Sequence, residues 1–211
     1  MNLFEHEQSK YNAVHEFCND ADTEEGRLSV GRQLSELLSL EYEFHTLWRS
    51  LLEESNSFLE IGLGCGSILG FFKERDIEYC GIDISNYAVS QLREQGLNAQ
   101  HMSCHKMEFE DDSFDVVQHL DGFEHIPVEW EEQALREELR VSSKYVFHAN
   151  AMGDAHLDRL SIEHGFDEVH VNIKNEEQWS SFYKQYKEKY KYNIVSDLAA
   201  HETYFIVLEK K

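Results

Sequence analysis

The sequence predicts an α/β protein built on a doubly wound, mostly parallel seven-stranded sheet. Two observations lead to this fold class. Short apolar runs of strand length alternate with amphipathic helical stretches, and the chain ends in two strand-like runs only a few residues apart. With 211 residues, of which 41% are hydrophobic, the chain is long enough to bury the core of such a sheet.

An N-terminal helical cap is expected before the sheet. The apolar positions that predict this helix recur every three or four residues, so they share one helix face: Leu37, Leu40, Phe44, Leu47 and Leu51. The chain has one proline and no Gly/Ser-rich run, so nothing marks a flexible linker. We therefore expect residues 1–55 to form the cap and residues 56–211 to form the domain that carries the sheet.

The first five strands alternate with helices, as in a parallel sheet covered on both faces. They are expected at residues 57–61, 79–83, 99–103, 114–120 and 144–149. Ser85 is a typical N-cap for the helix after the second strand, and Pro127 suits the first turn of the helix after the fourth. Residues 176–190 have a helical pattern, and the runs at 192–196 and 203–209 predict a terminal antiparallel hairpin.

Charge and cysteine usage restrict the partners and the location. The chain has 19 Lys and Arg against 41 Asp and Glu, a net charge of −22, which disfavours a nucleic-acid partner because phosphate backbones are repelled. No apolar leader begins the sequence and no stretch approaches the length of a membrane span. The four cysteines lack C-x-x-C spacing. We expect a cytoplasmic protein with free thiols and no membrane partner.

A glycine-rich turn follows the first strand and is the strongest candidate for a ligand site. Glycines at 62, 64 and 66 let a ligand approach the backbone, and the next helix begins with free N–H groups. A dinucleotide site has the spacing G-x-G-x-x-G, whereas here the spacing is G-x-G-x-G and position 67 is Ser. The spacing therefore disfavours an NAD-dependent oxidoreductase.

Three segments together resemble one enzyme family. FLEIGLGCGSIL and YCGIDIS resemble motifs I and II of class I S-adenosylmethionine (SAM)-dependent methyltransferases, and DDSFDVVQHLDGFEHIP resembles their fourth strand and the segment after it. The resemblance covers roughly residues 57–149. It implies an enzyme that transfers a methyl group from SAM to a small-molecule acceptor, with a hydroxyl oxygen as the expected target. A SAM-binding scaffold without catalysis is the alternative.

The resemblance also implies which residues bind the cofactor. Glu60 would hold the methionine end of SAM, which is cationic, and Asp83 would accept hydrogen bonds from both ribose hydroxyls. The other expected cofactor contacts are Gly62, Gly64, Gly66, Ile84, Ser103, Cys104 and His119. Family members often carry an acid after the third strand that holds the adenine amino group. This chain has none before Glu108, so Ser103, His105 or the backbone would replace it.

The segment after the fourth strand offers candidate catalytic residues. Asp121, Glu124 and His125 would share one face if this turn enters a helix. The pattern D-x-x-E-H is similar to the E-x-x-E-H metal site of ubiquinone-pathway and small-RNA O-methyltransferases. It implies that these three residues bind Mg²⁺ or Mn²⁺, which would make a hydroxyl more acidic. Two alternatives stay open: His125 acts as a general base without metal, or Glu124 and His125 only hold the turn in place.

Two further features have a functional and a structural interpretation. His148 ends the fifth strand, so it either faces the acceptor as a catalytic residue or satisfies a backbone group. A further metal ligand could come from His148, His156 or His164. The aromatic stripe of the 176–190 helix favours packing, although it could also roof the acceptor pocket. Its members are Trp179, Phe182, Tyr183, Tyr186 and Tyr190.

Overall fold

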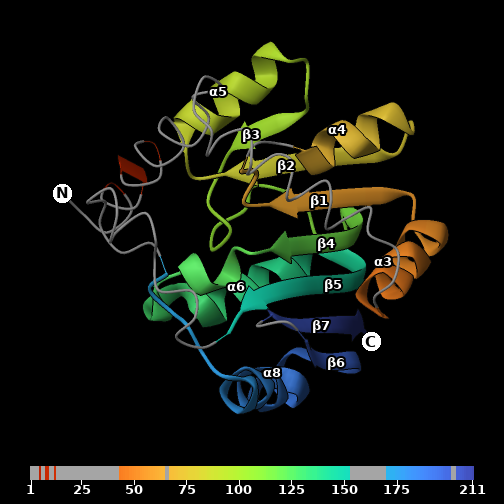
Figure 1. Ribbon diagram of the computed structural model, residues 1–211, viewed down its shortest axis with the longest axis vertical. Helices are drawn as coiled ribbons and strands as arrows, with labels where there is room; N and C mark the ends of the chain where they lie inside the picture. The colour runs from red at the N-terminus through yellow and green to blue at the C-terminus, as the bar shows by residue number, and fades with distance from the viewer. Residues whose placement is uncertain are drawn as a thin grey trace. The chain divides into compact units, whose positions relative to one another are not determined.

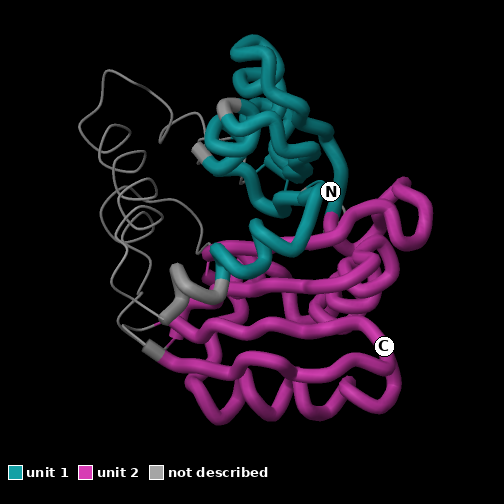
Figure 2. Tube along the Cα trace, turned by 90° about the vertical axis from the view of Figure 1, so that its right-hand side faces the viewer, with its two compact units in different colours: residues 1–103 teal, residues 104–211 magenta. Residues whose placement is uncertain are grey.

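The computed structural model describes residues 5, 8, 9, 12, 43–64, 67–152, 170–200 and 203–211. The chain divides into two compact units, residues 1–103 and residues 104–211 (Figure 2). The expected boundary between a cap and a sheet domain at residue 55 is not tested by this division and stays a prediction.

Seven strands form one sheet in the order β3-β2-β1-β4-β5-β7-β6 (Figure 1). Their bounds are β1 (Ser57–Ile61), β2 (Glu78–Asp83), β3 (Ala99–His101), β4 (Phe114–Leu120), β5 (Ser142–Ala151), β6 (Tyr192–Ala200) and β7 (Thr203–Lys210). β2 pairs in parallel with β1 and β3, and β4 pairs in parallel with β5. β7 is antiparallel to β5 and β6, which confirms the predicted hairpin and the mostly parallel fold class.

Five α-helices and a short turn of 3-10 helix are described. They are α3 (Glu43–Glu54), α4 (Ser67–Glu74), α5 (Asn86–Glu94), η1 (Phe123–His125), α6 (Val128–Val141) and α8 (Glu176–Tyr190). α4 packs on β2, α5 packs on β2 and β3, α6 packs on β4 and β5, and α8 packs on β6. Among the described residues, no helix combines the length and the apolar character needed to cross a membrane.

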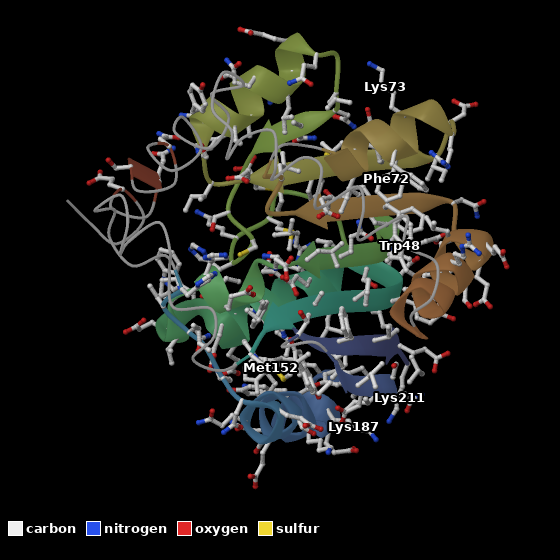
Figure 3. The ribbon with its side chains drawn as sticks, viewed as in Figure 1. Trp48, Phe72, Lys73, Met152, Lys187 and Lys211 are labelled. Carbon is white, nitrogen blue, oxygen red and sulfur yellow. The ribbon has the colours of Figure 1, made fainter. Side chains whose placement is uncertain are left out.

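The core of the first unit lies between its strands and helices α3, α4 and α5. Trp48 of α3 is buried and packs against Phe71 and Phe72 of α4, with ring centroids 5.2 and 6.4 Å away (Figure 3). Leu51, on the predicted apolar face of this helix, is also buried. The other four predicted positions lie outside the described side chains. α5 begins as expected at Ser85, whose Oγ accepts a hydrogen bond from the backbone N–H of the third residue of the helix.

The core of the second unit is formed by β4, β5, α6 and α8. α6 begins after Pro127, as the sequence predicts, and α8 begins in a capping box between Asn175 and Gln178. Trp179, Phe182 and Tyr183 of α8 are buried. These three members of the aromatic stripe therefore have the predicted packing role, whereas Tyr186 and Tyr190 are half-buried and hydrogen-bond to Glu132.

Candidate functional site

The glycine-rich turn connects β1 to α4 in the conformation that glycine allows. Gly62 and Gly64 have φ angles of 76° and 48°, in the left-handed region that residues with a Cβ atom rarely adopt. Glu60 is buried in β1, two residues before Gly62. Gly66 lies outside the described residues. The turn thus begins at the carboxyl end of a parallel strand, where ligands bind in sheets of this kind.

Asp83, the last residue of β2, faces the glycine-rich turn. Its side chain is buried, and Oδ2 accepts a hydrogen bond from the backbone N–H of Leu63 at 2.8 Å. Oδ1 accepts another from the N–H of Ser85 at 2.7 Å. Asp83 thus lies at the carboxyl end of β2 beside the glycine-rich turn, and its role in binding the ribose stays a prediction.

The end of β3 presents a residue that the sequence did not single out. His101 pairs in register with Asp83, and its Nε2 lies 3.1 Å from the carbonyl oxygen of Ile84. Ser103, the last residue of the first unit, is half-buried. His101 lies two residues before Ser103, the expected adenine contact, and belongs to no sequence motif. Only its pairing with Asp83 marks it as a residue near the site.

Of the predicted adenine contacts, Cys104 and His105 belong to the second unit, and both are half-buried. The His105 ring stacks on Trp130, with centroids 4.1 Å apart and planes at 21°. Burial lowers the pKa of His105, and the neighbouring Lys106 adds to this effect. This stacking gives His105 a packing role within the second unit.

Two histidines predicted to contact ligands are paired with a buried glutamate, and their predicted ligand contacts stay predictions. His119 Nδ1 lies 3.0 Å from Oε1 of Glu138, and His148 Nε2 lies 2.6 Å from Oε2 of the same carboxylate. Asn150 donates a hydrogen bond to the hydroxyl of Tyr183, which lies 2.7 Å from Nδ1 of His148. All five side chains are buried. His148 is thus held by side chains on both ring nitrogens rather than by a backbone group.

The charge of this network is concentrated on Glu138. Burial alone would raise its pKa, but the electrostatic interaction with His148 and the hydrogen bonds from both imidazoles lower it to about 2. The hydrogen bonds are consistent when Tyr183 donates to Nδ1 of His148, because the Nε2–H of His148 then donates to Glu138. The sequence could not reveal this network, because a glutamate on an amphipathic helix normally faces solvent.

The second cluster of potential ligands contains Glu124 and His125, as predicted, together with His170. One donor atom from each of the three residues lies within 4.8 Å of the others. Glu124 is buried, and its Oε2 has no hydrogen-bond partner among the described residues. The rings of His125 and His170 lie 4.6 Å apart, and both side chains are half-buried. A backbone hydrogen bond from Asn172 N–H to the Glu124 carbonyl oxygen, 2.9 Å long, holds the two segments together.

Asp121 does not join this cluster. It is exposed, has a φ of 47° and precedes η1, which covers only three residues. The predicted shared face requires an α-helix from residue 121 onward. The chain instead makes a tight turn there, and His170 is brought in from a distant segment. His156 and His164, named as further ligands, lie outside the described residues.

Burial governs the proton affinity of Glu124. Removal from water raises the pKa of its carboxyl group, while backbone hydrogen bonds and the nearby His170 act in the opposite direction. An unpartnered buried oxygen next to two imidazoles is a costly arrangement for a carboxylate. A proton or a cation at this position would relieve that cost.

Comparisons with known proteins agree with the fold and the turn. Residues 58–144 match the family described as "Methyltransferase domain". No curated protein matches the chain in sequence.

Solved structures are similar over most of the chain. Magnesium protoporphyrin IX methyltransferase from Synechocystis PCC 6803, solved with bound S-adenosylhomocysteine (SAH), has 12% identity and a TM-score of 0.71, and the match covers 100% of both chains. The PH0226 protein from Pyrococcus horikoshii OT3 has 18% identity and a TM-score of 0.67, covering 96% of this chain and 99% of that one.

A SAM-dependent methyltransferase from Methanosarcina mazei has 19% identity and a TM-score of 0.60, covering 78% of this chain and 96% of that one. At these identities the structures show the fold, and the match over residues 58–144 adds the enzyme class. Residues 58–144 thus match a methyltransferase domain, and the chain has the fold of SAM-dependent methyltransferases, which supports a methyltransferase enzyme with SAM as its cofactor.

Proposed function

We propose that the enzyme methylates a hydroxyl oxygen of a small molecule and that Glu124, His125 and His170 act on this hydroxyl with the help of a divalent cation. The observation that carries the proposal is the buried Oε2 of Glu124, which has no hydrogen-bond partner among the described residues although two imidazoles lie next to it.

The donor set of the cluster favours one group of cations. One carboxylate and two imidazoles suit Mn²⁺ and similar transition ions, whereas Mg²⁺ prefers oxygen ligands throughout. This proposal replaces Asp121 by His170 in the expected ligand set. When bound, the cation would supply Lewis acidity that makes the acceptor hydroxyl easier to deprotonate.

For the rest of the reaction, the acceptor must be positioned and its hydroxyl proton must be removed. Methyl transfer converts the sulfonium of SAM into the neutral thioether of SAH, and the acceptor oxygen loses its proton. We propose that His125, which is half-buried, orients the acceptor as a ligand of the cation, and that the hydroxyl proton passes to solvent. Alignment of the acceptor oxygen with the methyl–sulfur bond and exclusion of water supply the rest of the catalysis.

On the cofactor side we propose the predicted contacts of the first unit. Asp83, whose carboxylate lies beside the glycine-rich turn, binds the ribose hydroxyls, and Glu60 attracts the cationic methionine end. Gly62 and Gly64 keep the turn open to the cofactor. Ile84 and Ser103 flank the adenine.

The test is methyl transfer from isotopically labelled SAM to panels of phenols, sugars, amines and peptides. We expect labelled product from the hydroxyl compounds only, loss of activity in EDTA and recovery with Mn²⁺. Glu124→Gln and His170→Gln should each reduce kcat at least 100-fold, in line with losses of metal ligands or their supports. Glu129→Ala removes an exposed carboxylate of α6 and serves as the control.

Three outcomes would argue against this proposal in different ways. Activity that persists fully in EDTA but is lost in His125→Gln would show a metal-free base. Methylation of amines alone would contradict the hydroxyl target. SAM binding without transfer to any acceptor would favour a scaffold.

A further inference from the structure

Two side chains near the start of the chain contact the residues around the ribose carboxylate. The Oδ1 of Asn12 accepts a hydrogen bond from the Oγ of Ser85 at 2.8 Å and another from the backbone N–H of Tyr87 at 3.2 Å. The Nε2 of Gln8 lies 2.6 Å from the Nε2 of His101. Segments more than 70 residues apart in sequence are thereby joined.

The partners of Gln8 and Asn12 surround Asp83. Ser85 is two residues after it and uses its backbone N–H to bind the Asp83 carboxylate. His101 is the register partner of Asp83 on β3 and also lies within hydrogen-bonding distance of the Ile84 carbonyl oxygen. Gln8 and Asn12 therefore bind the carboxyl ends of β2 and β3, at the part of the site that receives the adenosine.

The two side chains lie on one face of a helical segment. Residues 5, 8, 9 and 12 are helical, and positions 8 and 12 are one turn apart. Gln8 and Asn12 are half-buried, whereas Glu5 and Ser9 are exposed. Figure 1 shows this segment in red near the N-terminal end of α5. One helix face is thus directed at the cofactor side of the first unit.

We infer that Gln8 and Asn12 are positioning residues for the cofactor, which hold the Asp83–Ser85 turn and the end of β3 in the conformation that binds adenosine. Asn12 fixes the N-terminus of α5, and with it the N–H of Ser85 that orients Asp83. Gln8 holds His101 at the end of β3. This pair of contacts supports the site where the family's usual acid after the third strand is missing.

Binding of the cofactor and docking of the N-terminal segment are then coupled. If the N-terminal segment holds the site in its binding conformation, the cofactor must stabilise the docked segment by the same factor. We expect SAH to slow hydrogen exchange of the backbone amides in residues 1–12.

The experiment measures the Kd of SAH by titration calorimetry for the wild type and five variants. Asn12→Leu and Gln8→Leu remove the polar groups while keeping similar volume. The loss of three hydrogen bonds should weaken SAH binding by about 10-fold or more in the double variant. Asn12→Asp keeps the acceptor oxygen and should retain wild-type affinity. Ser9→Ala, on the exposed face, is the control, and circular dichroism verifies that each variant is folded.

The inference is overturned if the double Leu variant binds SAH as tightly as Ser9→Ala, or if exchange in residues 1–12 is the same with and without SAH. A wild type that binds no SAH would refute the cofactor assignment itself, which is a different result. Because SAH binding needs no acceptor, failure of the proposed hydroxyl target leaves this test unaffected.

Discussion

At the scale of single residues, the second unit contains a buried anion that is stabilised only by its neighbours. Each oxygen of Glu138 interacts with a different imidazole, from His119 on β4 and from His148 on β5. The phenyl ring of Phe123 in η1 stacks on His148, with centroids 4.8 Å apart. Through this contact with Phe123, the network supports the turn that carries Glu124 and His125.

Removal of one partner from this network should be costly. We expect Glu138→Ala to destabilise the protein by about 3–5 kcal/mol, because two buried imidazoles lose their partner. Urea denaturation followed by circular dichroism measures the loss, with the exposed Glu129→Ala as control. A loss below about 1 kcal/mol, the value typical of an exposed ion pair, would show that the network contributes little.

At the scale of elements, the contact between α4 and β2 depends on a glycine. A Cβ atom at Gly81 would lie 2.3 Å from Cδ2 of Leu63 and 2.8 Å from Cδ1 of Leu69. Both leucines belong to a buried cluster with Val89 and Leu92, so they have little room to move. The close approach positions the start of α4 over the strand that ends in Asp83.

A matched pair of substitutions tests this contact. Gly81→Ala should destabilise the protein by about 1–3 kcal/mol through overpacking. Gly70→Ala, in α4, has no atom within 4 Å of the new Cβ and should stabilise the protein by about 0.5–1 kcal/mol through helix propensity. Midpoints of urea denaturation give both values. Equal effects of the two substitutions would contradict the packing argument.

At the scale of the whole molecule, two buried glutamates have opposite responses to pH. The pKa of Glu138 is lowered, so its contribution to stability is present above its unfolded pKa and is lost as the pH falls toward about 2. The pKa of Glu124 is raised by burial, so its contribution is present at low pH and is lost as the pH rises through the raised value. Near neutral pH, a cation at Glu124 would offset this loss.

The cation should therefore stabilise the protein more at high pH than at low pH. We expect Mn²⁺ to raise the Tm more at pH 8 than at pH 5, because protons compete with the cation for Glu124. Thermal denaturation with and without Mn²⁺ measures the shift, and Glu124→Gln should abolish it. An unchanged shift in that variant would place the cation elsewhere.

Local sequence patterns predicted much of the fold. β4 and α8 have the bounds that the sequence predicts, and Ser85 caps α5 as expected. Such features depend on periodicity and on capping chemistry within a few residues, so a single chain contains the information. The bounds of β3 and β5 differ by a few residues, since strand ends depend on pairing.

By itself, the sequence determined the order of strands and helices, the glycine-rich turn and the position of Asp83, because each rests on residues that are close neighbours along the chain. Only the tertiary structure decided the partners: Glu138 for His119 and His148, and His170 rather than Asp121 beside Glu124. These contacts join residues that the fold brings together from different strands, helices and turns. Burial then changes their charge and hydrogen bonding in ways that local periodicity does not encode.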